Sequence, residues 1–171
     1  MTTDKVTAEA PSMLWSRHAP LALIVALATI IIDQANKFWM LHVYDIESKG
    51  RIWITPFLDF VFVKNTGISY SMFNQDSQEG QYILAAFAAV VSVLMWLWLN
   101  KASTGRLMTW SIALIIGGAI GNAIDRVLLG GVADFYSLHA FGFYWYVFNI
   151  ADVAIVAGVI GLLYDSFKGE S

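Results

Sequence analysis

The 171-residue sequence contains no cysteine. This absence excludes disulfides, thiolate nucleophiles and thiolate metal ligands. Histidine is scarce too: only His18, His42 and His139 occur, far apart in the sequence and without an H-E-x-x-H motif. A glycine-rich phosphate loop is also absent. We therefore expect neither a metal nor any other cofactor.

Charged residues are few. They make up 13% of the chain, whereas about 25% is usual in soluble domains. Hydrophobic residues reach 58%, and the mean hydropathy is +0.62. This composition predicts an integral membrane protein. The formal net charge of -3 shows no basic excess, so we expect no nucleic-acid partner.

Four segments are long and apolar enough to cross a bilayer, for which a helix needs about 20 mostly apolar residues. They are residues 20–41, 82–99, 107–128 and 144–164. The first segment also fits a signal peptide, but the following "DQANKFW" offers no small-residue cleavage site, so we treat it as retained. We expect an all-α membrane protein with four transmembrane helices in one domain, residues 20–165. The polar tails, 1–19 and 166–171, lie outside this domain.

The basic residues that flank the spans predict the orientation, because they are enriched on the cytoplasmic side. One side carries Lys5, Arg17, Lys101, Arg106 and Lys168, and the other only Lys49, Arg51 and Lys64. Both termini are therefore expected in the cytoplasm, with the loop at about 42–80 outside. That loop contains "RIWITPFLDFVFVKNTG", which is rich in β-branched and aromatic residues. It predicts a small β-rich extracytoplasmic cradle between helices 1 and 2.

With this topology the polar residues of the spans converge in the outer half of the bilayer. They are Asp33, Asn36, Lys37, Asn122, Asp125, Arg126, Asn149 and Asp152. Members of each helix are three or four residues apart and share a face, which must turn inward. Gly130 and Gly131 are expected to end the third helix and to direct Asp134 back into the bundle.

Structural roles remain open for many of these residues. Ion pairs or headgroup-level charges account for Asp33, Lys37, Asp125 and Arg126, and a turn accounts for residues 65–67. Asp134 alone fits a structural or a functional role equally. Asp152, about 12 Å into a helix that begins near residue 144, favours function, because an isolated buried acid is costly.

Two carboxylates that face each other cannot both ionise cheaply, so the pair holds one proton near neutrality. Such a pair can hydrolyse a peptide bond, with one member as base and the other as acid. A serine protease is less well supported: Ser69 and Ser71 lie near Lys64, but no G-x-S-x-G occurs. A proton or cation transporter, or an assembly factor with buried polar pairs, remains open from these residues alone.

Five short motifs occur in order along the chain. They are "DQANK" at 33–37, "KNTGISYSMF" at 64–73, "GNAIDR" at 121–126, "VADF" at 132–135 and "FNIAD" at 148–152. Together they closely resemble the bacterial lipoprotein signal peptidases, the signal peptidase II family, over about residues 20–165. The departures are Lys64 where the family often has an aromatic or apolar residue, Ile68 where it has small residues, and Val153 where it has serine.

The resemblance implies an intramembrane aspartic endopeptidase of the bacterial inner membrane. Its substrates are diacylglyceryl-modified prolipoproteins, cut just before the lipidated lipobox cysteine. The resemblance implies that Asp134 and Asp152 are catalytic. It implies substrate binding or site support for Asn65, Gly67, Asn122, Arg126 and Asn149, and structural support for Asp33, Lys37 and Asp125. It also implies contact with membrane lipids, and we expect a monomer.

Overall fold

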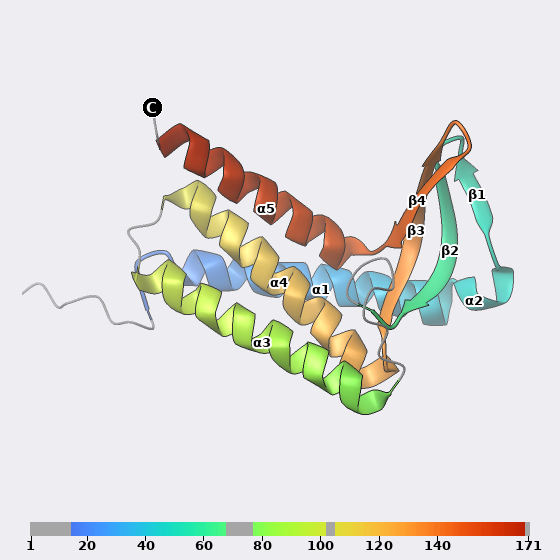
Figure 1. Cartoon of the computed structure of the whole chain (residues 1–171), viewed down its shortest axis with the longest axis horizontal. Helices are drawn as coiled ribbons and strands as arrows, with labels where there is room; N and C mark the ends of the chain where they lie inside the picture. The colour runs from blue at the N-terminus through green and yellow to red at the C-terminus, as the bar shows by residue number, and fades with distance from the viewer. Residues whose placement is uncertain (1–14, 68–76, 102–104, 170–171) are drawn as a thin grey trace, which may run out of the picture.

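The computed structural model describes residues 15–67, 77–101 and 105–169. Most of the N-terminal tail, Ile68, and the two serines considered above lie outside the described residues. Four long helices form the bundle in Figure 1: α1 (Ala19–Phe38), α3 (Gln78–Lys101), α4 (Arg106–Leu129) and α5 (Ile150–Gly169). A π-helical turn, η1 (Trp39–Val43), extends α1. As predicted, four helices of the described chain are long and apolar enough to cross a membrane.

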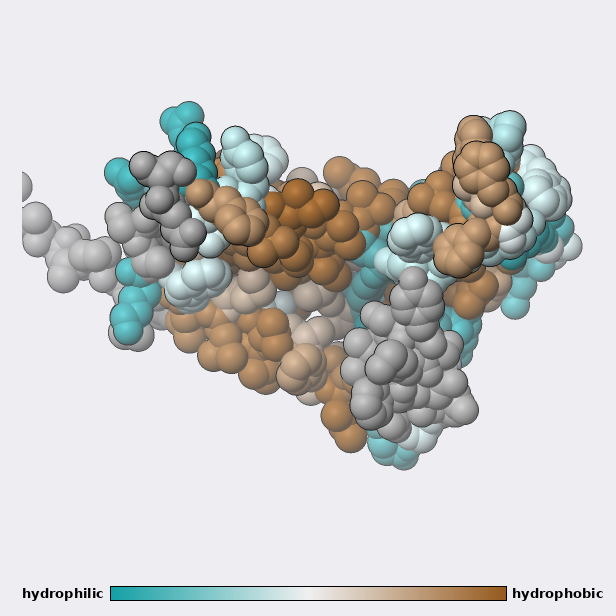
Figure 2. Space-filling view, turned by 45° about the horizontal axis from the view of Figure 1, so that its top comes forward, coloured by the Kyte–Doolittle hydropathy of each residue, from teal (hydrophilic) through white to brown (hydrophobic). Residues whose placement is uncertain are grey.

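The outer surface of the bundle is apolar. Large hydrophobic side chains such as Phe87 on α3 and Ile160 on α5 are more than half exposed. Figure 2 shows apolar residues over the middle of the bundle and hydrophilic residues toward both of its ends. A helix that is apolar on its exposed face is suited to lipid, because lipid satisfies apolar but not polar side chains.

Helix α4 is the centre of the bundle, since it packs against α1, α3 and α5. Close approach depends on glycine. A Cβ at Gly117 would lie 2.7 Å from the Cβ of Thr29 on α1, and one at Gly118 would lie 2.5 Å from the carbonyl oxygen of Ala151 on α5. The small residues therefore let polar side chains of three helices meet in the interior.

A four-stranded antiparallel sheet stands at one end of the bundle (Figure 1). Its order is β1 (Ile52–Thr55), β2 (Leu58–Asn65), β3 (Val132–Ala140) and β4 (Phe143–Phe148). A short helix, α2 (Ile46–Lys49), precedes β1. Strands β1 and β2 confirm the prediction of β-structure after the first span.

The prediction placed the cradle between the first two long helices, but this segment supplies only strands β1 and β2. Half of the sheet, β3 and β4, lies between α4 and α5. The last helix begins at Ile150 rather than near residue 144. The physical reason is the aromatic run "FYWYVF", which suits a pleated strand, and the turn at Phe141 and Gly142. Both turn residues have positive φ, 51° and 81°, as a tight two-residue hairpin requires.

Asp59, a fully buried residue of β2, stabilises the sheet. Its carboxylate oxygens lie 2.8 Å from Nη1 of Arg51 and 2.9 Å from Nε2 of His139. Burial opposes ionisation of Asp59, but the hydrogen bonds and charges of these two partners outweigh it and lower the pKa. The contacts join β2 to β3 and to the residue before β1.

Candidate active site

Asp134 reaches the interior from β3, which follows α4 after a sharp turn. As predicted, Gly130 ends α4 in the left-handed conformation, with φ of 67°. Strand β3 then pairs with β2 so that Val63 lies opposite Asp134 and Asn65 opposite Val132. The Asp134 side chain is 1% exposed.

Asp152 lies in the first turn of α5, not two turns into a helix as the sequence suggested. The Asp152 backbone N–H donates to Oδ1 of Asn149 at 3.0 Å, and the Asn149 backbone N–H donates to Oδ2 of Asp152 at 3.2 Å. This reciprocal pair is a capping box, here in an N-x-x-D sequence. The spacing of the two residues in "FNIAD" was the signal for this helix start.

Asn149 also connects the two carboxylates. Its Nδ2 donates to Oδ1 of Asp134 at 2.6 Å, while its backbone N–H binds Asp152. Asp134 and Asp152, from separate elements, therefore share one completely buried neighbour. Two further amides fix the remaining oxygens: Asn65 Nδ2 donates to Oδ2 of Asp134 at 3.2 Å, and Asn122 Nδ2 donates to Oδ1 of Asp152 at 2.9 Å.

Burial and the neighbouring acid both change the titration of Asp134. Burial, and secondly the charge of Asp152, raise the pKa of Asp134 to about 7, although hydrogen bonds from Asn149 and Asn65 oppose the shift. At neutral pH the pair can therefore hold a proton. In the described part of the chain, neutral amides rather than cations bind both carboxylates directly. Among these residues, no ion pair therefore removes the tendency of the pair to keep a proton.

Behind the two acids lies a buried ion triad of Asp33, Lys37 and Asp125. Nζ of Lys37 is 2.8 Å from an oxygen of each carboxylate, and it donates to Oδ1 of Asn122 at 3.2 Å. All three side chains are at most 3% exposed. Asn122 thus connects the triad to Asp152. The sequence placed Asp33 and Lys37 together on α1, and the structure adds Asp125 from α4.

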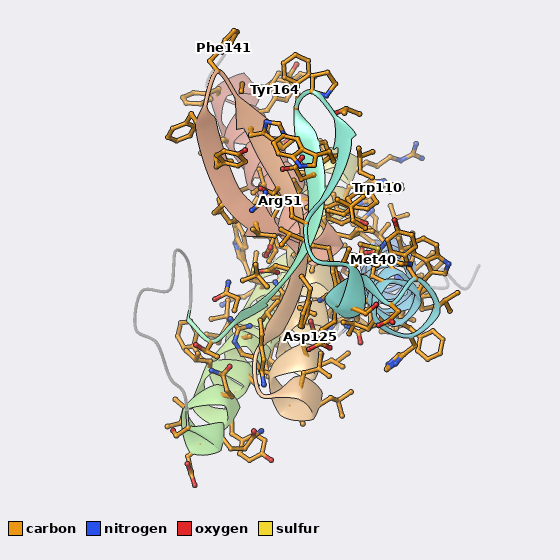
Figure 3. All side chains as sticks on the ribbon, turned by 90° about the vertical axis from the view of Figure 1, so that its right-hand side faces the viewer. Met40, Arg51, Trp110, Asp125, Phe141 and Tyr164 are labelled. Atoms are coloured by element: carbon orange, nitrogen blue, oxygen red, sulfur yellow. The ribbon has the colours of Figure 1, made fainter. Side chains whose placement is uncertain are left out.

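The triad also holds the backbone beside each acid. Oδ1 of Asp33 accepts a hydrogen bond from the N–H of Ala151 at 3.0 Å, and Oδ2 of Asp125 accepts one from the N–H of Ala133 at 3.0 Å. Ala151 immediately precedes Asp152, and Ala133 immediately precedes Asp134. In the view of Figure 3, Asp125 lies well inside the molecule, whereas Phe141 projects from the hairpin tip.

Gln34 is a site residue that the sequence reasoning missed. Its Nε2 donates to Oδ1 of Asp125 at 2.9 Å and to the carbonyl oxygen of Gly121 at 3.1 Å. It also lies 3.2 Å from Oδ2 of Asp33. Its place between Asp33 and Lys37 in "DQANK" was the available signal. Gln34 joins α1 to α4 within the triad.

Arg126 and Gly67 are brought together beside the pair. Nη2 of Arg126 donates to the carbonyl oxygen of Gly67 at 3.1 Å, and Nη1 donates to the carbonyl oxygen of Asn122 at 3.2 Å. The N–H of Gly67 in turn donates to Oδ1 of Asn65 at 3.0 Å. The guanidinium therefore connects the end of the β2 segment to α4.

Two apolar grooves meet at Asp152. The first, about 340 Å³, lies between α3, α4 and α5 and is lined by Leu84, Phe87, Asn122, Arg126, Tyr146 and Asp152, among others. The second, about 640 Å³, follows α5 and the end of the sheet and is lined by Trp145, Tyr146, Phe148, Asp152, Val156 and Ile160, among others. Within the described part of the chain, no group of three or more His, Asp or Glu residues is arranged to hold a metal ion.

Comparisons with known proteins agree on one family. A family model described as signal peptidase (SPase) II matches residues 25–168. The chain is 52% identical over 149 residues to a lipoprotein signal peptidase of Nitrobacter hamburgensis, covering 85% of this chain and 90% of that protein. It is 48% identical over 147 residues to one of Beijerinckia indica subsp. indica, covering 86% and 87%.

Two solved structures, both described as bacterial membrane enzymes, have a similar fold. The first has a TM-score of 0.73 at 27% identity and covers 89% of this chain and 90% of its own. The second has a TM-score of 0.66 at 28% identity and covers 87% and 94%.

Proposed function

The chain belongs to the signal peptidase II family of aspartic proteases, which removes signal peptides from lipoproteins, and we propose that Asp134 and Asp152 are its catalytic pair. One observation carries this assignment. The single residue Asn149 binds both carboxylates, one through its side chain and one through its backbone N–H. This shared contact supports joint action of the two acids in the reaction.

The chemistry follows from one proton on two carboxyl groups. The ionised member takes a proton from water as the water oxygen attacks the scissile carbonyl. The protonated member donates a hydrogen bond to the carbonyl oxygen, which becomes negative as the tetrahedral intermediate forms. A proton then passes to the leaving amine nitrogen as the C–N bond breaks. The raised pKa of Asp134 supports its role as the protonated member at the start.

The substrate has an apolar segment on each side of the scissile bond: the signal peptide before it and the diacylglyceryl chains after it. The two grooves that meet at Asp152 match this arrangement. We assign the signal peptide to the groove between α3, α4 and α5, where Asn122 and Arg126 offer polar groups to a peptide backbone. The acyl chains are assigned to the groove along α5, whose lining is almost wholly apolar.

The chain is a multi-pass protein of the bacterial inner membrane. We propose that both termini are cytoplasmic and that the sheet and the catalytic pair lie toward the extracytoplasmic leaflet. The excess of basic residues beside the opposite helix ends supports this orientation. Asp134 and Asp152 come from one chain, so a monomer supplies a complete pair, and we propose a monomer.

Purified protein with a diacylated prolipoprotein tests the catalytic assignment. Asp134→Asn and Asp152→Asn should each slow release of the signal peptide by roughly 10²–10⁴-fold, because Asn has similar size but cannot exchange a proton. Asp45→Asn is the matched control. Asp45 is exposed and has φ of 52°, which Asn tolerates, so its rate should equal wild type. Release of the signal peptide at the wild-type rate by Asp134→Asn or Asp152→Asn, with unchanged circular dichroism, would contradict the assignment.

A further inference from the structure

A further cavity, distinct from the two grooves at Asp152, lies where helices α1 and α4 end. Its volume is about 330 Å³, and its lining includes Leu41, His42, Glu47, Phe62, Lys64 and Leu129. Neither catalytic aspartate contributes to it. Met40, the neighbour of Leu41, lies beside α2 in Figure 3. The cavity is therefore at the level where the bundle meets the sheet.

This level has the character of a membrane–water boundary. Phe38 and Trp39 are 62% and 45% exposed at the end of α1, and exposed aromatic residues concentrate at such boundaries. Within the cavity, Leu41 and Leu129 supply apolar surface from the ends of two spanning helices. His42, Glu47 and Lys64 supply polar groups. A site with apolar walls and ionisable groups fits a molecule that is itself amphipathic.

The two charged residues of the cavity have opposite signs and are not used elsewhere. Across residues 15–67, 77–101 and 105–169, neither Glu47 nor Lys64 takes part in an ion pair. Both side chains are exposed. The neighbouring Lys49, in contrast, donates to the carbonyl oxygen of Tyr44 and lies over the ring of that residue.

Packing holds Lys64 in place. A Cβ at Gly131 would lie 3.0 Å from Cγ of Lys64, so the aliphatic stem rests against this glycine. Nζ of Lys64 lies 3.5 Å from the Cβ position of Gly130, the C-cap of α4. The carbonyl end of a helix favours a positive charge. The ammonium group thus lies beside the end of α4, at the edge of the cavity that Lys64 lines.

We propose that this cavity binds a zwitterionic glycerophospholipid of the surrounding bilayer, with its phosphate at Lys64, its amine at Glu47 and an acyl chain along Leu41 and Leu129. One positive and one negative group match a headgroup that carries one of each. The apolar helix ends continue into the lipid-facing surface of the bundle. Neither Asp134 nor Asp152 lines this site, and the proposal does not depend on the assignment of that pair.

Native mass spectrometry of the full-length protein tests the proposal without substrate. The protein is incubated with equal amounts of phosphatidylethanolamine, phosphatidylglycerol and diacylglycerol. Phosphatidylethanolamine should be retained preferentially. Lys64→Gln should reduce retention of both phospholipids about tenfold, because it removes a charge-assisted contact to phosphate. Glu47→Gln should reduce phosphatidylethanolamine to the level of phosphatidylglycerol, which has the phosphate but no amine.

Lys49→Gln is the matched control, and its lipid retention should equal wild type. The two test substitutions lie on different elements, and circular dichroism verifies that each variant keeps its helices. Wild-type retention of both phospholipids by Lys64→Gln would overturn the proposal. So would equal retention of diacylglycerol and phosphatidylethanolamine, since the cavity would then recognise only acyl chains. An unchanged lipid preference in Glu47→Gln would overturn the assigned amine contact and the choice of a zwitterionic headgroup.

Discussion

Oδ1 of Asp33 on α1 accepts a hydrogen bond from the backbone N–H of Ala151, 118 positions later in the chain, at 3.0 Å. Ala151 is the residue before Asp152. The first helix thus fixes the backbone from which a proposed catalytic side chain projects. Asp125 has the same relation to Ala133 and Asp134. These contacts give the buried triad a positioning role that can be tested by mutation.

Replacement of Lys37 should destabilise the protein more than replacement of either of its partners. Lys37→Met leaves two buried carboxylates without their shared cation, at a cost of roughly 3–5 kcal/mol. Asp33→Asn and Asp125→Asn each leave Lys37 with one carboxylate, so their cost should be smaller. Thermal unfolding in a fixed detergent gives the order. A smaller loss for Lys37→Met than for both Asn variants would show that the triad is not the source of this stability.

Asn149 should contribute to stability and to catalysis through different atoms. Asn149→Ala removes the cap of α5, at about 1 kcal/mol, and the amide that binds Asp134. Asn149→Ser restores a capping oxygen but not the amide donor. We therefore expect Ser to recover most of the unfolding temperature but little of the peptidase rate. Recovery of both by Ser would indicate that the Asn149–Asp134 contact is dispensable.

A methyl group at Gly121 should disturb the triad. The added Cβ would lie 2.7 Å from Oδ2 of Asp33, the oxygen that binds Lys37. Such overpacking typically costs about 1–3 kcal/mol. Gly121→Ala should therefore lower both the unfolding temperature and the rate of signal-peptide release. Gly105→Ala is the control, because nothing lies within 4 Å of its Cβ position and its φ of -75° suits alanine.

The rate of signal-peptide release should fall as pH rises through about 7. Asp134 has its pKa raised to about 7 in the folded protein, so above that pH the pair loses the proton that the reaction needs. A rate that stays constant from pH 6 to 9, roughly two units above this value, would contradict the shared-proton mechanism. The profile is measured as kcat/KM, with substrate well below KM, so that it reports the free enzyme to which this pKa belongs.

The stability of the folded protein should also fall as pH rises, because of the same group, Asp134. The folded state keeps a proton on Asp134 up to about pH 7, whereas the ordinary value is 3.8. The stabilisation from protonated Asp134 is therefore complete below about pH 4 and is lost as pH rises to about 7. Asp134→Asn should flatten this part of the curve of unfolding temperature against pH. Persistence of the slope in that variant would assign it to another group.

The helices and the two acids were accessible from the sequence because their signals are local. Unbroken apolar runs predict spans, and acids within apolar surroundings are costly enough to be informative. The β3–β4 hairpin was missed because an aromatic run such as "FYWYVF" is apolar at every position. Such a run fits the end of a membrane helix as well as a strand.

The contacts that hold the backbone beside the two acids were not accessible, because they join distant segments through backbone N–H groups. Nothing in the type of Ala133 or Ala151 shows that its N–H binds a carboxylate from another element. Gln34 was missed because its place between Asp33 and Lys37 in the sequence does not show which groups of α4 its amide binds. The capping box of Asn149 and Asp152 did have one, and it would have moved the helix start to its correct place.

The same two hydrogen bonds of the capping box begin the last helix and orient Asp152, so both form together. Asn149 also binds Asp134 through its side-chain amide, and Asp33 of the first helix binds the N–H of Ala151. A chain whose final span has not yet joined the other three consequently has no assembled pair of acids. Under the proposed catalytic assignment, proteolytic competence is therefore acquired only once the final span is in place.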